Sequence, residues 1–508
     1  MRSNRPVEIA AFVILAAIFV AVRCRELTDT CLWFDEIFSV HAAEHSWDSI
    51  LTFVALDLIH PPLFYVLLKL WIAVAGESLS SLRALPVLFS IVSIVPFLLL
   101  LRELKINIKT QCISLVLLII NGSILKYSLE VRMYSLLMCL GGFSMWLFAR
   151  FFVRGKSLAP LVIVNILLVY THYFGWFVVL SEVVAILAFE RKKFRPVMAM
   201  LGTVAAAFLP WVVAVWNAAA TGAGLNQNIG WMSRPGVKSI VQLVLNLIEP
   251  FYYQTSSAEP MSIFVVSLPI FVIAITALII YVADWKLQDV DGRKAFQLLA
   301  VFVAVPLSIA FTVSWFLPYS IWGTRHLIIV FVPVLILVAV AISHIPNSAI
   351  RTTAMTLILL FSGYALVSEI VKEQQPYVWC AWNDVATRVG DNHAAGESEP
   401  IYVFEELTAY HLWFVLRNTE NANVVLVKGT GVPEDKAYFL PRGFTSVDII
   451  DETNLTADRI AIAFRDDGFD PTKPPLIGLL HNGYEVVETV PFPAGSSSAF
   501  LVRLRKRS

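Results

Sequence analysis

The chain has 508 residues, of which 58% are hydrophobic and only 15% charged, and its mean hydropathy is +0.72. These values exclude a soluble globular enzyme and indicate a protein that crosses a membrane several times. The 38 basic and 38 acidic residues cancel, so the charge gives no reason to expect nucleic acid as a partner.

The first apolar run, near residues 6–22, follows Arg2 and Arg5, as the apolar core of a signal peptide would. A cleavage site would need small residues after this run, and Arg23-Cys24-Arg25 stands there instead. We therefore expect the run to be retained as a membrane anchor.

Apolar runs of the length that spans a bilayer, roughly 17–25 residues, recur along the first three quarters of the chain. Eleven fall near 6–22, 84–101, 110–126, 133–153, 158–171, 172–190, 196–216, 261–283, 295–316, 325–343 and 352–370. A twelfth run, 62–76, is short, follows Pro61-Pro62 and carries Lys69, which is typical of a helix that lies in the membrane interface. We therefore expect about eleven transmembrane helices.

The distribution of positive charge predicts which loops face the cytoplasm. If the N-terminus is cytoplasmic and 62–76 does not cross, Lys and Arg gather in the inside loops near 102–109, 154–156, 191–195, 286–294 and 351. The outside segments are then 23–83, 127–132, the turn at His172, 217–260, 317–324 and the C-terminal tail. If 62–76 crossed, this rule would fail in every later loop.

Beyond about residue 371 the chain becomes polar. Strand-like runs occur at 400–404, 423–427, 459–464, 484–490 and 499–504, with helical candidates at 379–389, 407–416 and 475–482. The alternation predicts a small α/β domain. We thus expect a transmembrane domain at 1–370, with an outer loop at 23–83, and a C-terminal extracytoplasmic α/β domain at 371–508.

The five cysteines show no metal-binding spacing. Cys24 and Cys31 could pair across a short loop in an oxidising compartment, but the sequence favours isolated thiols.

On this topology the outer face gathers ionisable and aromatic residues from six separate places in the chain. A carboxylate can act as a general base toward a hydroxyl, and several cations can hold a phosphate group. This combination predicts an enzyme that moves a group from a lipid phosphate to a hydroxyl. The candidates are Asp35, Glu36, His60, Arg83, Glu130, Arg132, Tyr134, His172 and Arg325.

Each candidate also has an ordinary structural explanation. Carboxylates in outer loops are usually solvated, and arginines at span ends, such as Arg83 and Arg325, are often anchors in the lipid headgroups. His172 between aromatic residues is typical of an interface histidine, and Glu182, in the middle of a span, is expected to bond within the bundle. Only the convergence of the candidates on one face favours a functional site.

The motif W-F-D-E-I-F-S follows the first span, and H-P-P-L-F-Y follows at 60–65. Further motifs are G-E-S-x-x-S-L-R-A-L-P at 76–86, E-V-R-M-Y-S at 130–135, Y-T-H-Y at 170–173 and T-R-H at 324–326. In type and order they resemble the motifs of C-type (GT-C fold) glycosyltransferases, the superfamily of protein O-mannosyltransferases and aminoarabinose transferases. The resemblance covers most of residues 7–345 and is closest to bacterial members similar to rhizobial galacturonosyltransferases.

The resemblance implies a polyprenyl-phosphate-linked sugar as donor and an inverting transfer to a lipid, glycan or protein hydroxyl outside the membrane. Asp35 matches the family's catalytic base, and Glu36 would hold the acceptor or orient the loop. The residues expected to bind the donor phosphate or substrate are His60, Arg83, Glu130, Arg132, Tyr134, His172 and Arg325.

The resemblance also bears on cofactor and location. No metal is expected to be required, because only Asp35, Glu36 and Glu130 could supply oxygen ligands to a divalent ion. The expected location is the bacterial inner membrane with an extracytoplasmic active site, and the endoplasmic reticulum membrane is the alternative. The resemblance does not cover the C-terminal domain.

A transporter or lipid flippase of the cell-envelope pathway is the alternative function. Transporters place charges and broken helices near the middle of the bilayer. The ionisable residues of this chain instead gather at one predicted face, with Glu182 as the main exception. The sequence therefore favours the transferase.

Overall fold

A computed structural model describes residues 5–25, 27–221, 229–230, 232–251, 262–371, 378–394, 400–419, 423–433, 437–495 and 497–507. The chain divides into two compact units. The first unit comprises residues 1–27, 59–217 and 229–372. The second unit comprises residues 28–58, 218–228 and 373–508, so it joins part of the expected outer loop to the C-terminal residues.

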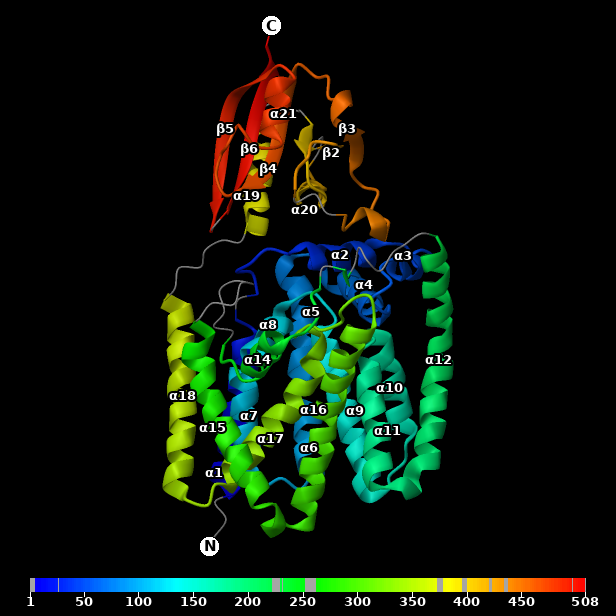
Figure 1. Ribbon diagram of the computed structural model, residues 1–508, viewed down its shortest axis with the longest axis vertical. Helices are drawn as coiled ribbons and strands as arrows, with labels where there is room; N and C mark the ends of the chain where they lie inside the picture. The colour runs from blue at the N-terminus through cyan, green and yellow to red at the C-terminus, as the bar shows by residue number, and fades with distance from the viewer. Residues whose placement is uncertain are drawn as a thin grey trace. The chain divides into compact units, whose positions relative to one another are not determined.

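The first unit is helical, and Figure 1 shows its long helices running alongside one another. Its helices are α1 (Arg5–Arg23), α4 (Leu63–Ala75), α5 (Leu79–Val92), α6 (Ile94–Glu103), α7 (Ile108–Ile120), α8 (Gly122–Leu129), α9 (Tyr134–Arg154), α10 (Ala159–Thr171), α11 (Gly175–Phe189), α12 (Phe194–Ala220), α14 (Val237–Asn246), α15 (Ser262–Ala283), α16 (Val290–Phe316), α17 (Phe331–His344) and α18 (Ser348–Val371). Short 3-10 helices occur at Arg191–Lys193 (η1), Trp285–Leu287 (η2) and His326–Val330 (η3).

These helices account for the apolar runs of the sequence. In the described part of the chain, seven helices are long and apolar enough to cross a membrane, counting α5 with α6, η1 with α12 and η3 with α17. Four shorter apolar helices, α1, α7, α10 and α11, coincide with the four other expected spans. The short apolar helix α4 coincides with the twelfth run, 62–76, and the short apolar helix α14 lies within the expected outer segment 217–260. The chain is therefore a multi-pass α-helical membrane protein, as the sequence predicts.

Two expected spans are interrupted, and the second interruption leads to the site. Residues 84–101 are divided at Ser93, between α5 and α6. Residues 110–126 are divided at Asn121, whose side-chain oxygen accepts a 2.9 Å hydrogen bond from the Ile124 backbone and caps α8. The side-chain amide of Asn121 donates to the Leu247 carbonyl at 2.9 Å. The break therefore starts the separate helix that ends just before Glu130.

The second unit is a small α/β structure, as the sequence predicts. Its helices are α2 (Phe34–Glu44), α3 (Ile50–Leu56), α19 (Val378–Ala394), α20 (Glu406–Leu416) and α21 (Leu476–His481). Its strands are β1 (Ile401–Val403), β2 (Val424–Lys428), β3 (Asp448–Asp451), β4 (Arg459–Asp466), β5 (Tyr484–Ala494) and β6 (Ser497–Lys506), in the order β3-β2-β1-β4-β6-β5. Strands β1–β4 pair in parallel, and β6 lies antiparallel between β4 and β5.

All five expected strands are present, and β3 was missed. Only Ile449 and Ile450 separate its terminal aspartates, and the strand lies at the edge of the sheet, so it carries little apolar pattern. The core of the sheet includes Ile460, Ile462 and Val502, which are at most 1% exposed.

A disulfide joins Cys31 to Cys380 within the second unit, with Cα atoms 5.3 Å apart. The expectation of an isolated thiol was therefore wrong for Cys31, and its partner is not the alternative, Cys24, which is free and exposed. The two bonded cysteines are 349 positions apart, a separation that local spacing does not reveal.

Candidate active site

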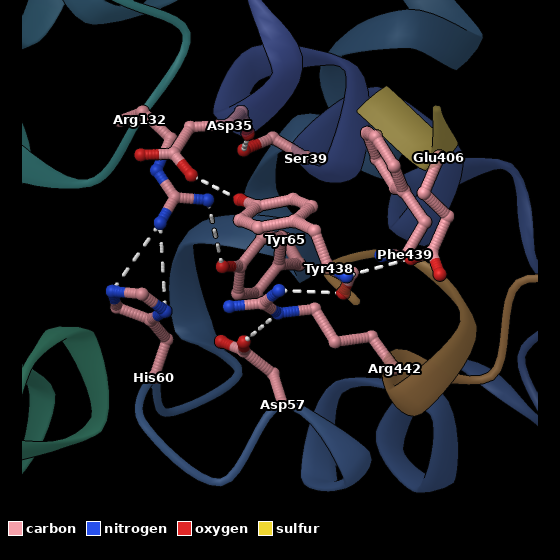
Figure 2. A network of polar contacts seen from close by, with 10 residues as sticks. All are labelled: Asp35, Ser39, Asp57, His60, Tyr65, Arg132, Glu406, Tyr438, Phe439 and Arg442. Carbon is pink, nitrogen blue, oxygen red and sulfur yellow. Dashed lines mark hydrogen bonds and ion pairs between the residues drawn. The ribbon is translucent and has the colours of Figure 1, made fainter. Parts of the chain in front are cut away.

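In the first unit, short connections between helices bring basic and aromatic side chains together. Arg132 lies between α8 and α9 and is 2% exposed. Its Nη2 lies 3.3 Å from Nε2 of His60, in the connection that precedes α4, and its Nη1 donates to the hydroxyl of Tyr65 at 3.3 Å (Figure 2). A guanidinium only donates hydrogen bonds, so both partners act as acceptors here. Arg132 is thus fixed by the H-P-P-L-F-Y segment.

His172 is held in the tight turn between α10 and α11. A Cβ on Gly175 would lie 2.7 Å from the Leu168 carbonyl oxygen, so the turn requires glycine there. The backbone N–H of Phe174 donates to Nδ1 of His172 at 3.1 Å. Nδ1 is therefore an acceptor, and the ring proton of neutral His172 is on Nε2.

The rings of His60, Tyr134 and His326 surround His172, with centroids 5.6, 6.3 and 5.4 Å from it. Burial lowers the pKa of His172 well below 6.5, and the charges of His326, His60, Arg132 and Arg325 lower it further. His172 is therefore neutral at pH 7. Its Nε2 atom is buried and has no hydrogen-bond partner among the described residues.

We call this group the cation cluster: His60, Tyr65, Arg132, Tyr134, His172, Arg325 and His326. It combines two arginines, several N–H donors and burial, and it lies where α4, α9, α11 and η3 begin. A buried donor without an acceptor is costly, and a phosphate would supply acceptor oxygens. The cluster is suited to bind an anionic group.

The other candidates of the first unit have different surroundings. Arg83, on α5, is 3% exposed and donates to the Leu27 carbonyl at 3.2 Å. The Glu130 carbonyl accepts a 2.7 Å hydrogen bond from the Arg132 backbone, which bends the chain between α8 and α9. Lys69 is half-buried on α4.

Glu182 is held inside the helical bundle. Its carboxylate accepts hydrogen bonds from Ser144 of α9 at 2.7 Å and from Asn165 of α10 at 2.8 Å. The sequence predicts that Glu182 bonds within the bundle, and these two hydrogen bonds confirm that prediction.

Asp35 and Glu36 belong to the second unit, in the first turn of α2, and are 7% and 1% exposed. The Glu36 carboxylate accepts a 3.1 Å hydrogen bond from the Trp33 backbone, which caps the helix. Asp35 accepts a hydrogen bond from the hydroxyl of Tyr438 (Figure 2). The negative charge of Asp35 is favourable at a helix N-terminus.

Sequence reasoning missed Tyr65, His326, Tyr438 and Arg442. The first two stand inside the motifs H-P-P-L-F-Y and T-R-H and could have been taken from them. Tyr438 and Arg442 lie in a segment without any motif that we recognised. The sequence around them shows only an arginine close to aromatic residues. Such a combination is ordinary in a soluble domain and does not by itself indicate a functional site.

Within the described ranges, no group of three or more His, Cys, Asp or Glu side chains is placed to hold a metal ion. The expectation that no metal is required stays a prediction.

No protein-family model matches the chain, and no curated protein matches it either. The crystal structure of ArnT from Cupriavidus metallidurans bound to undecaprenyl phosphate superposes with a TM-score of 0.60 at 11% identity, over 97% of both chains. The apo state of the same protein gives 0.60 at 13% identity, again over 97% of both chains. The chain therefore shares the fold of this ArnT structure.

An oligosaccharyltransferase from Archaeoglobus fulgidus matches more weakly, with a TM-score of 0.49 and 14% identity over 81% of this chain and 62% of that one. At these identities the likeness to ArnT concerns the fold, so the activity must be argued from the residues of the site.

Proposed function

We propose that the protein is an inverting membrane glycosyltransferase that moves a sugar from a polyprenyl phosphate to a hydroxyl on the extracytoplasmic side. The observation that carries the proposal is the cation cluster, where the buried Nε2–H of His172 has no acceptor among the described residues. Such a site suits a phosphate, and it occurs in a fold whose neighbour ArnT was crystallised with undecaprenyl phosphate.

An apolar cavity in the first unit supports a lipid-linked donor. It has a volume of about 300 Å³, and its lining includes Leu15 and Ile18 of α1 and Leu125 and Leu129 of α8. Leu129 directly precedes Glu130, two residues before Arg132. An isoprenoid chain against these residues would bring its phosphate toward the segment that carries Arg132.

In the proposed reaction, the acceptor oxygen attacks the anomeric carbon while the bond from that carbon to the phosphate oxygen breaks. The acceptor proton passes to the carboxylate of Asp35, and the bonding electrons leave with the polyprenyl phosphate. A phosphate leaving group needs its charge stabilised more than it needs a proton. Arg132, Arg325 and the neutral donor His172 serve that need.

The sequence resemblance supports a narrower assignment. A hexosyl donor, with galacturonosyl as the first to test, fits the likeness to rhizobial galacturonosyltransferases, and a lipid or glycan hydroxyl is the acceptor we favour. Glu36 orients the start of α2 beside the base. The charge distribution of the loops supports a site on the extracytoplasmic side of the membrane. The likeness to bacterial members of the family supports the bacterial inner membrane.

The test is transfer by the purified full-length protein. Labelled polyprenyl-phosphate sugars are offered with lipid and glycan acceptors, and covalent product and released polyprenyl phosphate are measured. We expect transfer by the wild type, a rate roughly 10²–10⁴-fold lower from Asp35→Asn, and nearly full transfer from Glu44→Gln. Glu44 is a matched control because it lies on the same helix and pairs with Arg417 at 3.0 Å. Movement of labelled lipid across the membrane without covalent product would support the flippase and overturn the proposal.

A further inference from the structure

Tyr438 meets Asp35 in the second unit although 403 positions separate them. Its hydroxyl donates to Oδ1 of Asp35 (Figure 2). Its ring packs edge-on against Phe34, with ring centroids 5.0 Å apart. Phe34 and Asp35 are the first two residues of α2. The C-terminal part of the chain therefore places a phenol directly on the proposed base.

Arg442 ties Tyr438 to the segment that carries this helix. Its guanidinium lies 3.8 Å from the centroid of the Tyr438 ring, and its Nη1 donates to the Tyr438 carbonyl at 2.6 Å. Its Nε donates to Asp57 at 2.7 Å, and both partners of this ion pair are at most 3% exposed. Burial lowers the pKa of Arg442, but Tyr438, Asp57 and Asp35 outweigh it and raise that pKa. Arg442 therefore stays charged beside the tyrosine.

Glu406, on α20, fixes the backbone of the same turn. Its Oε2 accepts hydrogen bonds from the N–H groups of Tyr438, Phe439 and Leu440 at 2.6, 2.7 and 3.1 Å. Glu406 is 1% exposed, and a buried carboxylate is tolerated only when it is bonded in this way. The backbone, the ring and the hydroxyl of Tyr438 are thus each held by a separate contact.

We propose that Tyr438 is a positioning residue for catalysis, which holds the Asp35 carboxylate in the orientation that receives the acceptor's proton. The inference rests on the proposed function, in which Asp35 is the base. During the step Tyr438 keeps its own proton, and the acceptor's proton goes to Asp35. The α/β part of the chain is then a component of the catalytic apparatus.

The hydrogen bond also has an effect on pH dependence. A hydrogen bond donated to a carboxylate favours the ionised form, which is the form that acts as a base. In the second unit, the ionisable groups around this contact are Glu36 on α2, Asp57 after α3, Glu406 on α20, and Tyr438 and Arg442 in and beside η4 (Leu440–Arg442). Removing the phenol hydroxyl alone leaves the other charges in place.

The experiment compares Tyr438→Phe with Tyr410→Phe in the full-length protein. We expect Tyr438→Phe to lower kcat roughly 10- to 100-fold, the range for a lost hydrogen bond to a charged group. The acid limb of the rate profile should move to higher pH, and KM for the donor should change only a few-fold. Tyr410 is buried in the same unit and its hydroxyl donates to the Phe444 carbonyl at 3.0 Å, so its loss should affect stability without moving the pH profile.

A double variant separates positioning from folding. If Tyr438 acts through Asp35, adding Tyr438→Phe to Asp35→Asn should leave the small residual rate unchanged. Independent, additive losses would overturn the inference, and so would a Tyr438→Phe variant with wild-type kcat and pH profile. If the wild type itself transfers no sugar, the proposed function fails instead. Hydrogen exchange of the β4 amides shows whether each variant is folded, and loss of that protection in Tyr438→Phe would make the residue structural and overturn its positioning role.

Discussion

Two buried polar groups of the molecule differ in how their hydrogen-bonding atoms are satisfied. One is the cation cluster of the first unit. The other, which we call the Tyr438 network, lies in the second unit and comprises Asp35, Asp57, Glu406, Tyr438 and Arg442. In the cluster, the Nε2–H of His172 has no acceptor among the described residues, and two arginines lie near it. In the network, Arg442 pairs with Asp57, and Glu406 accepts three backbone hydrogen bonds. A protein tolerates an unsatisfied buried donor where a ligand completes it, whereas a satisfied network fixes geometry. We therefore assign binding to the cluster and positioning to the network.

The largest expected effect comes from breaking the network. Arg442→Met leaves the charge of Asp57 buried without its partner, which should destabilise the second unit by about 3–5 kcal/mol. Hydrogen exchange of the β4 amides in the full-length protein measures this. The double variant Asp57→Leu/Arg442→Met, which removes both charges, should recover much of the loss. If Arg442→Met lowers the stability of the second unit no more than the loss of an exposed ion pair would, the network is not the rigid element that we describe.

In the cation cluster we expect a substitution to lower donor affinity much more than stability. His172→Phe removes an N–H donor that has no partner in the described structure, together with the Nδ1 acceptor of the Phe174 N–H, so stability should fall by only about 1 kcal/mol. Donor affinity should fall roughly 5- to 150-fold, from about 1–3 kcal/mol for a lost hydrogen bond. Binding of a fluorescent polyprenyl phosphate measures this. His344→Phe is the control, because His344 contacts Gln288 and Asp284 at the far end of α17. Unchanged donor affinity together with lower stability would make His172 a structural residue.

Acidification should weaken the second unit through His411. This side chain is 1% exposed, and burial lowers its pKa from 6.5 to about 3. Between pH 7 and 5.5 the unfolded chain binds a proton that the folded chain does not, so stability should fall by about 1 kcal/mol as the pH falls. Exchange of the β4 amides at both pH values should show this loss in the wild type, and His411→Gln should remove it. An equal loss in both proteins would refute the assignment.

The smallest effect is expected at a third buried polar group, in which Glu182 is hydrogen-bonded to Ser144 and Asn165 inside the helical bundle. Ser144→Ala removes one hydrogen bond to Glu182 and should cost about 0.6 kcal/mol, the average for such bonds in membrane proteins. Transfer and donor affinity should stay at wild-type values, as measured with the same labelled donor. A marked loss of transfer would give Glu182 a functional role and weaken the contrast between the two regions.

Much of the fold could be predicted because hydropathy and period are local properties. Each of the eleven apolar runs and five strands can be recognised from a short window of the sequence. The breaks at Ser93 and Asn121 could not be predicted in this way, because apolar residues continue on both sides of each. At Asn121 the break is stabilised by bonds to Ile124 and to the distant Leu247.

The site could be predicted only where its residues lie in motifs. His60, Arg132, Tyr134, His172 and Arg325 are expected residues that the fold gathers in one cluster. The contacts of Cys31, Asp35 and Asp57 with Cys380, Tyr438 and Arg442 each join positions more than 340 residues apart. Neither local pattern nor charge sorting carries information about pairs so distant.

The central claim is that binding and proton transfer are separate functions of the two regions. The most direct test measures donor dissociation constant and single-turnover rate for both Asp35→Asn and Arg132→Ala. Asp35→Asn should keep donor affinity within a few-fold and lose about 10²–10⁴-fold in rate, the usual cost of a positioned base. Arg132→Ala should weaken donor binding by at least about tenfold, or roughly 1.4 kcal/mol. Equal loss of affinity in both variants, or transfer by Asp35→Asn within a few-fold of the wild type, would contradict the account.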